Sequence, residues 1–151
     1  MDWKPDETNF LSVHLVVTDM KQSIDFYKEV LGFEESDSWK LESKGEVPHY
    51  IDMTYQGKRV ISFGAEDGPT NHEKLQSPAT SGHAGALRLW LYVEDVDATL
   101  ARAVAAGGKE MWPANDAFWG DRMAAFADPS GYVWTIAQHT GKMGTPPNFD
   151  G

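Results

Sequence analysis

An internal duplication limits the fold of this chain more than any other feature of its sequence. Alternating apolar residues over 10–17 predict a strand, and Asp19 is placed to cap a helix that ends at Gly32. The same pattern returns 76 residues later, with a strand over 87–93 and a helix cap at Asp95. Repeated units of this kind usually pack together, because each covers the apolar face that the other cannot bury alone.

Each repeat continues with three further predicted strands. They span 34–41, 49–55 and 58–64 in the first repeat and 109–112, 120–127 and 132–138 in the second. The segment Asp128-Pro129-Ser130-Gly131 matches a type I turn between the last two strands. The sequence therefore predicts an α+β fold of two βαβββ modules.

We expect the chain to form a single domain over 1–151. Module one covers about 8–64 and module two about 86–140. The segment 65–85 between them is rich in Gly, Pro, Ser and charged residues, which is typical of an exposed linker. The tail over 141–151 has no periodicity, and we expect it to be mobile.

Composition argues against several classes of function. With 13 basic and 23 acidic residues the chain has a net charge of -10 and no basic cluster, which argues against nucleic-acid binding. No apolar run approaches the roughly 20 residues that span a bilayer. The first residues lack the pattern of a signal peptide, so we expect a cytoplasmic protein without a membrane partner. Because the chain has no cysteine, its metal ligands are limited mainly to histidines and carboxylates.

Several segments resemble the vicinal oxygen chelate superfamily, which is the glyoxalase, bleomycin resistance protein and dioxygenase family. They are Val-Thr-Asp-Met-Lys-Gln-Ser-Ile-Asp-Phe-Tyr-Lys-Glu-Val-Leu-Gly-Phe at 17–33, Val-Glu-Asp-Val-Asp-Ala at 93–98, Phe-Trp-Gly-Asp-Arg at 118–122 and Asp-Pro-Ser-Gly-Tyr at 128–132. The Phe-Trp-Gly-Asp-Arg stretch is most similar to the PhnB-like branch. The resemblance covers roughly 8–140. It implies curved, mainly antiparallel half-sheets around a cavity, and a homodimer.

The resemblance also indicates where a metal ion would bind. Enzymes of this family hold a divalent metal at four inward positions, one on the first and one on the last strand of each module. In this sequence those positions fall on Ser12, Ser62, Arg88 and Thr135. A guanidinium offers only hydrogen-bond donors and a positive charge that repels a cation. We therefore expect no metal site and no cofactor.

Strand alternation selects the residues that face the predicted cavity. The apolar sets of the first strands must cover the helices, so Ser12, His14 and Val16, and likewise Arg88, Trp90 and Tyr92, point the other way. The candidate ligand-binding residues are His14, Arg88, Trp90, Tyr92, Trp119, Arg122, Thr135 and His139.

Each polar candidate has a second interpretation. His14 is either a ligand contact or base, or a hydrogen-bonded structural histidine. Arg88 pairs either with the negative group of a ligand or with an internal carboxylate, since a buried arginine needs an anion beside it. Arg122 binds a ligand or forms a salt bridge with Asp121 or a neighbouring carboxylate. His139 either reaches the cavity or, as we favour, is exposed at the end of its strand.

The leading hypothesis is a metal-free binding protein that holds a small organic ligand, anionic or aromatic, in an aromatic cavity. No catalytic residue is assigned. The alternative is an enzyme. It is either a metal-dependent lyase, isomerase or dioxygenase with a shifted ligand set such as His14 and His139 with a carboxylate, or a metal-free catalyst with His14 as base. A structural or regulatory interaction module is a third class, but it leaves the cavity residues unexplained.

Overall fold

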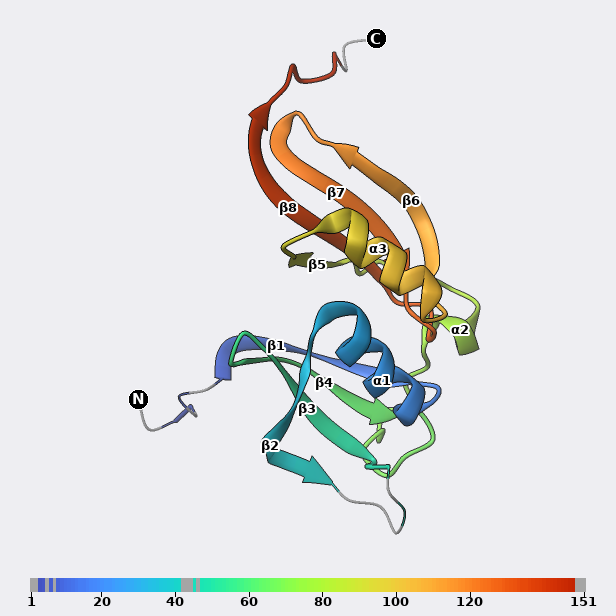
Figure 1. The fold of residues 1–151 in the computed structure, drawn as a ribbon. Coiled ribbons are helices and arrows are strands. Elements are labelled where there is room, and N and C mark those ends of the chain that lie inside the picture. Colours follow the sequence, from blue (N-terminus) through green and yellow to red (C-terminus); the bar gives the residue numbers. More distant parts are fainter. Residues whose placement is uncertain (1–2, 5, 7, 42–44, 46, 149–151) are drawn as a thin grey trace.

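The computed structural model describes residues 3–4, 6, 8–41, 45 and 47–148 of the chain. The α+β fold with two βαβββ modules is confirmed (Figure 1). Module one consists of β1 (Thr8–Val17), α1 (Met20–Leu31), β2 (Glu34–Leu41), β3 (Tyr50–Tyr55) and β4 (Lys58–Ala65). Module two consists of β5 (Leu89–Tyr92), α3 (Val96–Ala105), β6 (Lys109–Asp116), β7 (Trp119–Ala127) and β8 (Val133–Met143). A short helix, α2 (Pro78–Ser81), lies in the linker.

The duplication is visible in the topology of the two sheets. The strand order is β1-β4-β3-β2 in sheet one and β5-β8-β7-β6 in sheet two, so the same order occurs twice. In each sheet the first strand runs parallel to the last strand, and the other neighbours are antiparallel.

The two long helices begin at the predicted caps. The side chain of Asp19 accepts a hydrogen bond from the backbone N–H of Gln22 at 2.9 Å, and Asp95 caps Ala98 in the same way at 2.9 Å. Gly32 ends α1 with a φ of 69°, a left-handed conformation that glycine adopts without steric cost. None of the helices in the described part of the chain has the length and apolar character that a membrane crossing requires.

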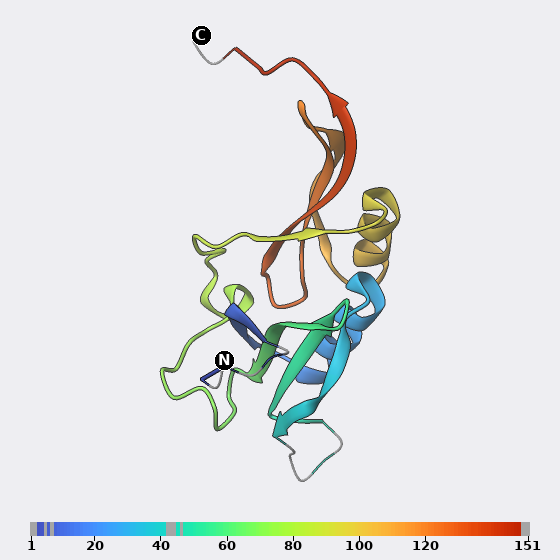
Figure 2. The same ribbon diagram turned by 90° about the vertical axis from the view of Figure 1, so that its left-hand side faces the viewer.

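The helices and sheets bury one continuous core between the modules. In Figure 2, α1 and α3 are stacked on one side of the molecule, and the linker runs on the opposite side. Tyr27 of α1 is fully buried, and its hydroxyl donates to Asp128 while accepting a hydrogen bond from Trp134 Nε1 at 2.8 Å. Tyr132 donates to the carbonyl of Val16 at 2.8 Å. These contacts fix module two against module one.

The turn predicted over 128–131 is confirmed, because the N–H of Gly131 donates to the carbonyl of Asp128 at 2.9 Å. Several strand limits differ from the sequence prediction, and β6 ends at Asp116 rather than at 112. β5 begins at Leu89 rather than at Leu87, which is exposed. β8 continues to Met143, so the last strand extends into the segment that the sequence assigns to a mobile tail.

Candidate functional site

Each sheet has one face covered by helices and one face that carries no helix, which we call its open face. In sheet one, Leu15 and Val17 belong to the core and His14 lies on the open face. In sheet two, Trp134 and Ile136 belong to the core, as the sequence predicts. Trp90 and Tyr92 alternate with the core-facing residues of β5, and the structure leaves them 46% and 54% exposed.

The parallel strand pairs place residues of the two open faces opposite one another. His14 lies opposite Ser62, and Trp90 lies opposite Thr135. Ser12 and Arg88, which the resemblance assigns to ligand positions on the first strands, each lie two residues before these paired residues. The alternation of faces is unchanged, because a shift of two residues keeps every side chain on its side of the sheet.

Three predicted site residues contact the carboxylate of Asp121 on the open face of sheet two. Its Oδ2 accepts hydrogen bonds from the hydroxyl of Tyr92 at 2.8 Å and from Trp119 Nε1 at 3.2 Å. Its Oδ1 is 2.9 Å from His139 Nδ1. The residue is only 3% exposed. We call Tyr92, Trp119, Asp121 and His139 the Asp121 cluster.

The hydrogen bonds to Asp121 set its charge and the tautomer of its neighbour. The bond from His139, and then the bond from Tyr92, lowers the pKa of Asp121, and the same carboxylate raises the pKa of Tyr92. An ionised carboxylate only accepts hydrogen bonds, so His139 must donate from Nδ1. Its Nε2 is then the nitrogen left for a ligand. The His139 side chain is 70% exposed, as the sequence predicts, but it is held in place.

A second polar group, the His14 cluster, lies on the open face of sheet one. His14 Nδ1 and Ser62 Oγ are 2.8 Å apart, and the imidazole is stacked on Tyr50 with ring centroids 5.4 Å apart. Tyr50 donates to Asp52 Oδ1 at 3.0 Å, and Arg59 forms an ion pair with Asp52 Oδ2 at 2.6 Å. We use the name for these five residues.

The environment of His14 favours the neutral imidazole. The residue as a whole is exposed, but desolvation of the ring against its neighbours lowers the pKa of His14. The carboxylates of Asp52 and Glu73 act in the opposite direction and to a smaller extent. A neutral imidazole offers one donor and one acceptor nitrogen, which is the form that a base requires.

Neither arginine candidate forms a hydrogen bond with the Asp121 cluster or the His14 cluster among the described residues, and Arg88 lines a separate hollow of about 190 Å³ with residues 84–87 and Val133. Arg88 precedes β5 and is exposed, and it has no hydrogen bond or ion pair with any residue that the structure describes. The expectation that its side chain is buried and desolvated is therefore wrong for the single chain. Arg122 turns toward the helix side, where it contacts Asp97 of α3 at 2.6 and 2.9 Å and Asp116 at 3.1 Å. Its partners are neighbouring carboxylates, the second interpretation of this residue, and Asp121 is not among them.

Thr135 occupies the centre of sheet two but has no access to solvent. The residue is 0% exposed, and its hydroxyl has no hydrogen-bond partner within the described part of the chain. A ligand would reach this hydroxyl only after a neighbouring side chain moved.

The residues present do not fit the metal site of the family. The paired central positions carry His14, Ser62, Trp90 and Thr135, which supply one imidazole among them. No group of three His, Asp or Glu side chains is placed to hold an ion over the ranges that the structure describes. A shifted set with both histidines is not assembled within one chain, since His139 lies with Asp121 on sheet two and His14 on sheet one.

Tyr50, Asp52 and Asp121 are functional candidates that the sequence prediction missed. In β3 the apolar Ile51 and Met53 alternate with polar residues, and this signal places Tyr50 and Asp52 on the open face. Asp121 gave no comparable signal, because its neighbour Arg122 is also charged and nothing in the order of the residues says which one faces the helix.

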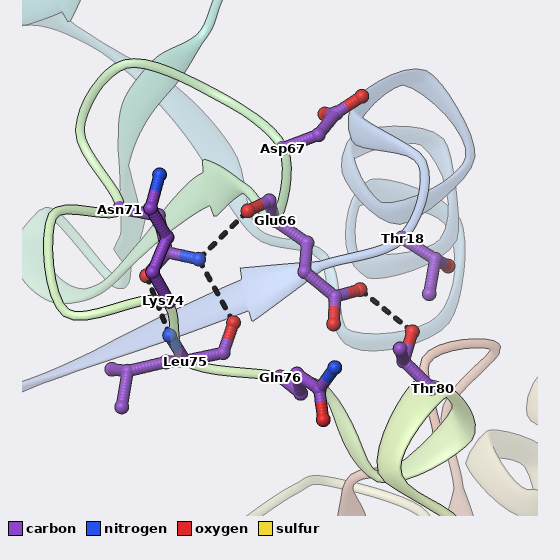
Figure 3. Close-up of a pocket in the computed structure, with 8 residues that line it drawn as sticks. All are labelled: Thr18, Glu66, Asp67, Asn71, Lys74, Leu75, Gln76 and Thr80. Carbon is purple, nitrogen blue, oxygen red and sulfur yellow. Dashed lines mark hydrogen bonds between the residues drawn. The ribbon is translucent and has the colours of Figure 1, made fainter.

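A hollow of about 440 Å³ lies beside the linker, and none of the residues that line it belongs to either cluster (Figure 3). Several of its polar groups form hydrogen bonds with one another. The amide of Asn71 donates to the carbonyls of Glu66 and Leu75 at 2.7 and 2.8 Å, and Thr80 donates to the Glu66 carboxylate at 2.8 Å. These bonds hold the linker in place, so we interpret the hollow as part of the scaffold.

Comparison with known proteins identifies the family. A family model described as the Glyoxalase/Bleomycin resistance protein/Dioxygenase superfamily matches residues 9–136. The uncharacterised protein Mb0911c of Mycobacterium bovis is 33% identical over 132 residues, which cover 85% of this chain and 82% of that protein.

Two solved structures are similar to this one. A glyoxalase-related enzyme from Fulvimarina pelagi is 25% identical with a TM-score of 0.60, over 85% of this chain and 87% of that chain. A glyoxalase/bleomycin resistance protein/dioxygenase family enzyme from Burkholderia phytofirmans PsJN is 20% identical with a TM-score of 0.64, over 88% of this chain and 97% of that chain. The second likeness is one of fold alone.

Proposed function

The chain belongs to the Glyoxalase/Bleomycin resistance protein/Dioxygenase superfamily, and we propose that it binds a planar organic molecule on the open face of sheet two without a metal ion. The observation that carries this proposal is the Asp121 cluster. Two of its side chains, Tyr92 and Trp119, are aromatic, 54% and 43% exposed, and hydrogen-bonded to one buried carboxylate. We also propose membership of the PhnB-like branch, from the Phe-Trp-Gly-Asp-Arg stretch at 118–122.

The affinity for a planar ligand would come from contact area on aromatic side chains that are already ordered before binding. A stacked aromatic pair contributes about 0.5–1.5 kcal/mol beyond the area that it buries. Ordering a side chain on binding costs about 0.5–1.5 kcal/mol, and Asp121 reduces this cost for Tyr92 and Trp119 because it already restrains them. Trp90, on the same face of β5, extends the aromatic surface.

We propose that the binding form is a homodimer. Large apolar side chains on the first strand of each module are exposed, with Phe10 at 77%, Leu11 at 84% and Trp90 at 46%. Burying exposed apolar side chains is favourable, and the open edge strands β1 and β5 also need cover. A second copy of the chain meets both needs and encloses the open faces.

Thermal melts with a panel of aromatic metabolites and antibiotics, in the presence of a chelator, test the binding function. We expect at least one planar compound to raise the melting temperature of the wild type. The increase should be lost in Trp119→Ala and kept in Val104→Ala, which removes an exposed apolar side chain of α3 outside the Asp121 cluster. A hit that stabilises both variants equally contradicts the site, and a hit that needs added metal contradicts the metal-free mode.

Acid–base catalysis by His14 is the second candidate function, and the contact between its Nδ1 and Ser62 Oγ at 2.8 Å favours it. The lowered pKa of His14 keeps the imidazole neutral at neutral pH. Deuterium exchange into the C–H bonds of a panel of carbonyl acids in D₂O, followed by proton NMR, tests this role. Exchange should require His14 and disappear in His14→Gln, whereas His83→Gln, which alters an exposed linker histidine, should retain it.

A further inference from the structure

We propose that His139, positioned by Asp121, takes the proton of an acidic hydroxyl on a planar ligand that lies against Trp119 and Tyr92. This inference rests on the proposed binding function and names the chemical class of the ligand, a phenol or enol. It follows from the geometry of the Asp121 cluster, in which one carboxylate holds an imidazole and two aromatic side chains together.

Asp121 fixes the orientation of the His139 imidazole. Asp121 Oδ1 is 2.9 Å from His139 Nδ1, and the carboxylate is only 3% exposed. An ionised carboxylate accepts a hydrogen bond from the Nδ1–H group, so the neutral imidazole carries its lone pair on Nε2. Because the His139 side chain is 70% exposed, this nitrogen is open to a ligand on the same face.

The electrostatics of the pair select a proton donor as the ligand. With a neutral imidazole, Asp121 and His139 together carry one negative charge, so they oppose an anion that arrives already ionised. A ligand that arrives neutral and gives up a proton avoids this repulsion. Its O–H bond breaks, the proton binds to Nε2, and the electron pair stays on the ligand oxygen. The carboxylate of Asp121 then stabilises the resulting imidazolium, in the same way that an orienting aspartate stabilises the imidazolium of a catalytic histidine.

The other titratable groups around His139 do not replace it in this role. On β5, Tyr92 donates its hydroxyl to Asp121 at 2.8 Å, so its proton is already engaged. On β7, Arg122 faces α3 and contacts Asp97 and Asp116. Within the Asp121 cluster, Nε2 of His139 is therefore the nitrogen that can accept a proton from a ligand.

Two probes that share a ring distinguish the contribution of the hydroxyl to binding from that of the ring. 4-Nitrophenol has an ionisable hydroxyl, and its anion absorbs visible light where the neutral form does not. 4-Nitroanisole has the same ring with a methyl group in place of the proton. Binding of each probe is measured by titration at about pH 7, where an imidazole of ordinary pKa is mostly neutral, and the absorption spectrum of the bound molecule is compared with that of the free probe at the same pH.

Three variants complete the experiment. His139→Gln removes the base, and Asp121→Asn keeps an oxygen that accepts from Nδ1 but removes the charge that stabilises the imidazolium. His83→Gln, in the linker, is the matched control for loss of a histidine. The melting temperature of each variant confirms that it is folded. Within the folded variants, the absorption of the bound probe reports the position of the proton, which a purely structural role would not change.

We expect wild type and His83→Gln to bind 4-nitrophenol roughly tenfold or more tightly than 4-nitroanisole and to show the absorption of the anion. His139→Gln and Asp121→Asn should lose both the preference and the anion absorption while still binding 4-nitroanisole. Equal binding of both probes by the wild type, or an anion spectrum that survives in folded His139→Gln, overturns the proton-accepting role and leaves the binding function standing. Failure of the wild type to bind either probe contradicts both.

Discussion

Tyr27 and Asp128 connect the two modules through a hydrogen bond inside the core. The tyrosine lies on α1 and the aspartate in the turn between β7 and β8, and both side chains are buried. Two repeats of one unit thus share a polar contact at the point where their apolar faces meet. Burial outweighs this hydrogen bond and raises the pKa of Asp128 from 3.8 to about 6.

The stability of the fold should therefore depend on pH through Asp128. The folded state holds this proton more tightly than the unfolded state, so the contribution is complete below about pH 4 and is lost as the pH rises through about 6. The difference is on the order of 3 kcal/mol. Urea unfolding of wild type and Asp128→Asn between pH 4 and 7.5 measures it. Parallel pH profiles for the two proteins would contradict the assignment.

Removal of the Tyr27 hydroxyl should destabilise the junction of the modules. Tyr27→Phe leaves the Nε1 of Trp134 without its acceptor in the core, and an unsatisfied buried donor costs about 1–3 kcal/mol. Tyr55→Phe is the matched control, since its hydroxyl donates at the surface to the carbonyl of Tyr92. Urea unfolding should show a larger loss for Tyr27→Phe than for Tyr55→Phe. Equal losses would mean that the buried network adds nothing.

Arg88→Met should leave the unfolding free energy within about 0.5 kcal/mol of the wild type. The guanidinium is exposed and has no partner among the described residues, so its removal leaves no carboxylate unpaired. Thermal melts without ligand check this expectation. A loss of several kcal/mol would indicate a hidden carboxylate partner. The same variant, titrated with an anionic aromatic ligand, also tests the role in ligand binding that the sequence predicts for Arg88.

Light scattering at micromolar concentration should report a dimer. The exposed apolar side chains of β1 and β5, together with the open edges of both sheets, are the surfaces that a second chain would cover. Phe10→Asp, on β1, should shift the equilibrium toward monomer, whereas Lys21→Asp, on the exposed side of α1, should not. A monomeric wild type would mean that one chain alone forms the binding site.

Local and periodic signals made the fold predictable. The caps at Asp19 and Asp95 and the alternation of apolar residues act over a few positions, so the sequence alone gives them. The register of parallel strands depends on the packing of the whole module, so the sequence could not show that His14 and Trp90 are the residues opposite Ser62 and Thr135. The alternation predicted His14, Trp90 and Tyr92 on the correct face, but it could not show that Asp121 joins Tyr92, Trp119 and His139.

An NMR titration of chelator-treated protein with 4-nitrophenol is the most direct test of metal-free binding at the Asp121 cluster. The indole N–H signal of Trp119, assigned with Trp119→Phe, and the imidazole signals of His139, assigned with His139→Gln, are followed together. We predict that both sets of signals shift with one common saturation curve in the absence of metal. Shifts confined to other residues, or shifts that need added divalent metal, would contradict metal-free binding at the Asp121 cluster.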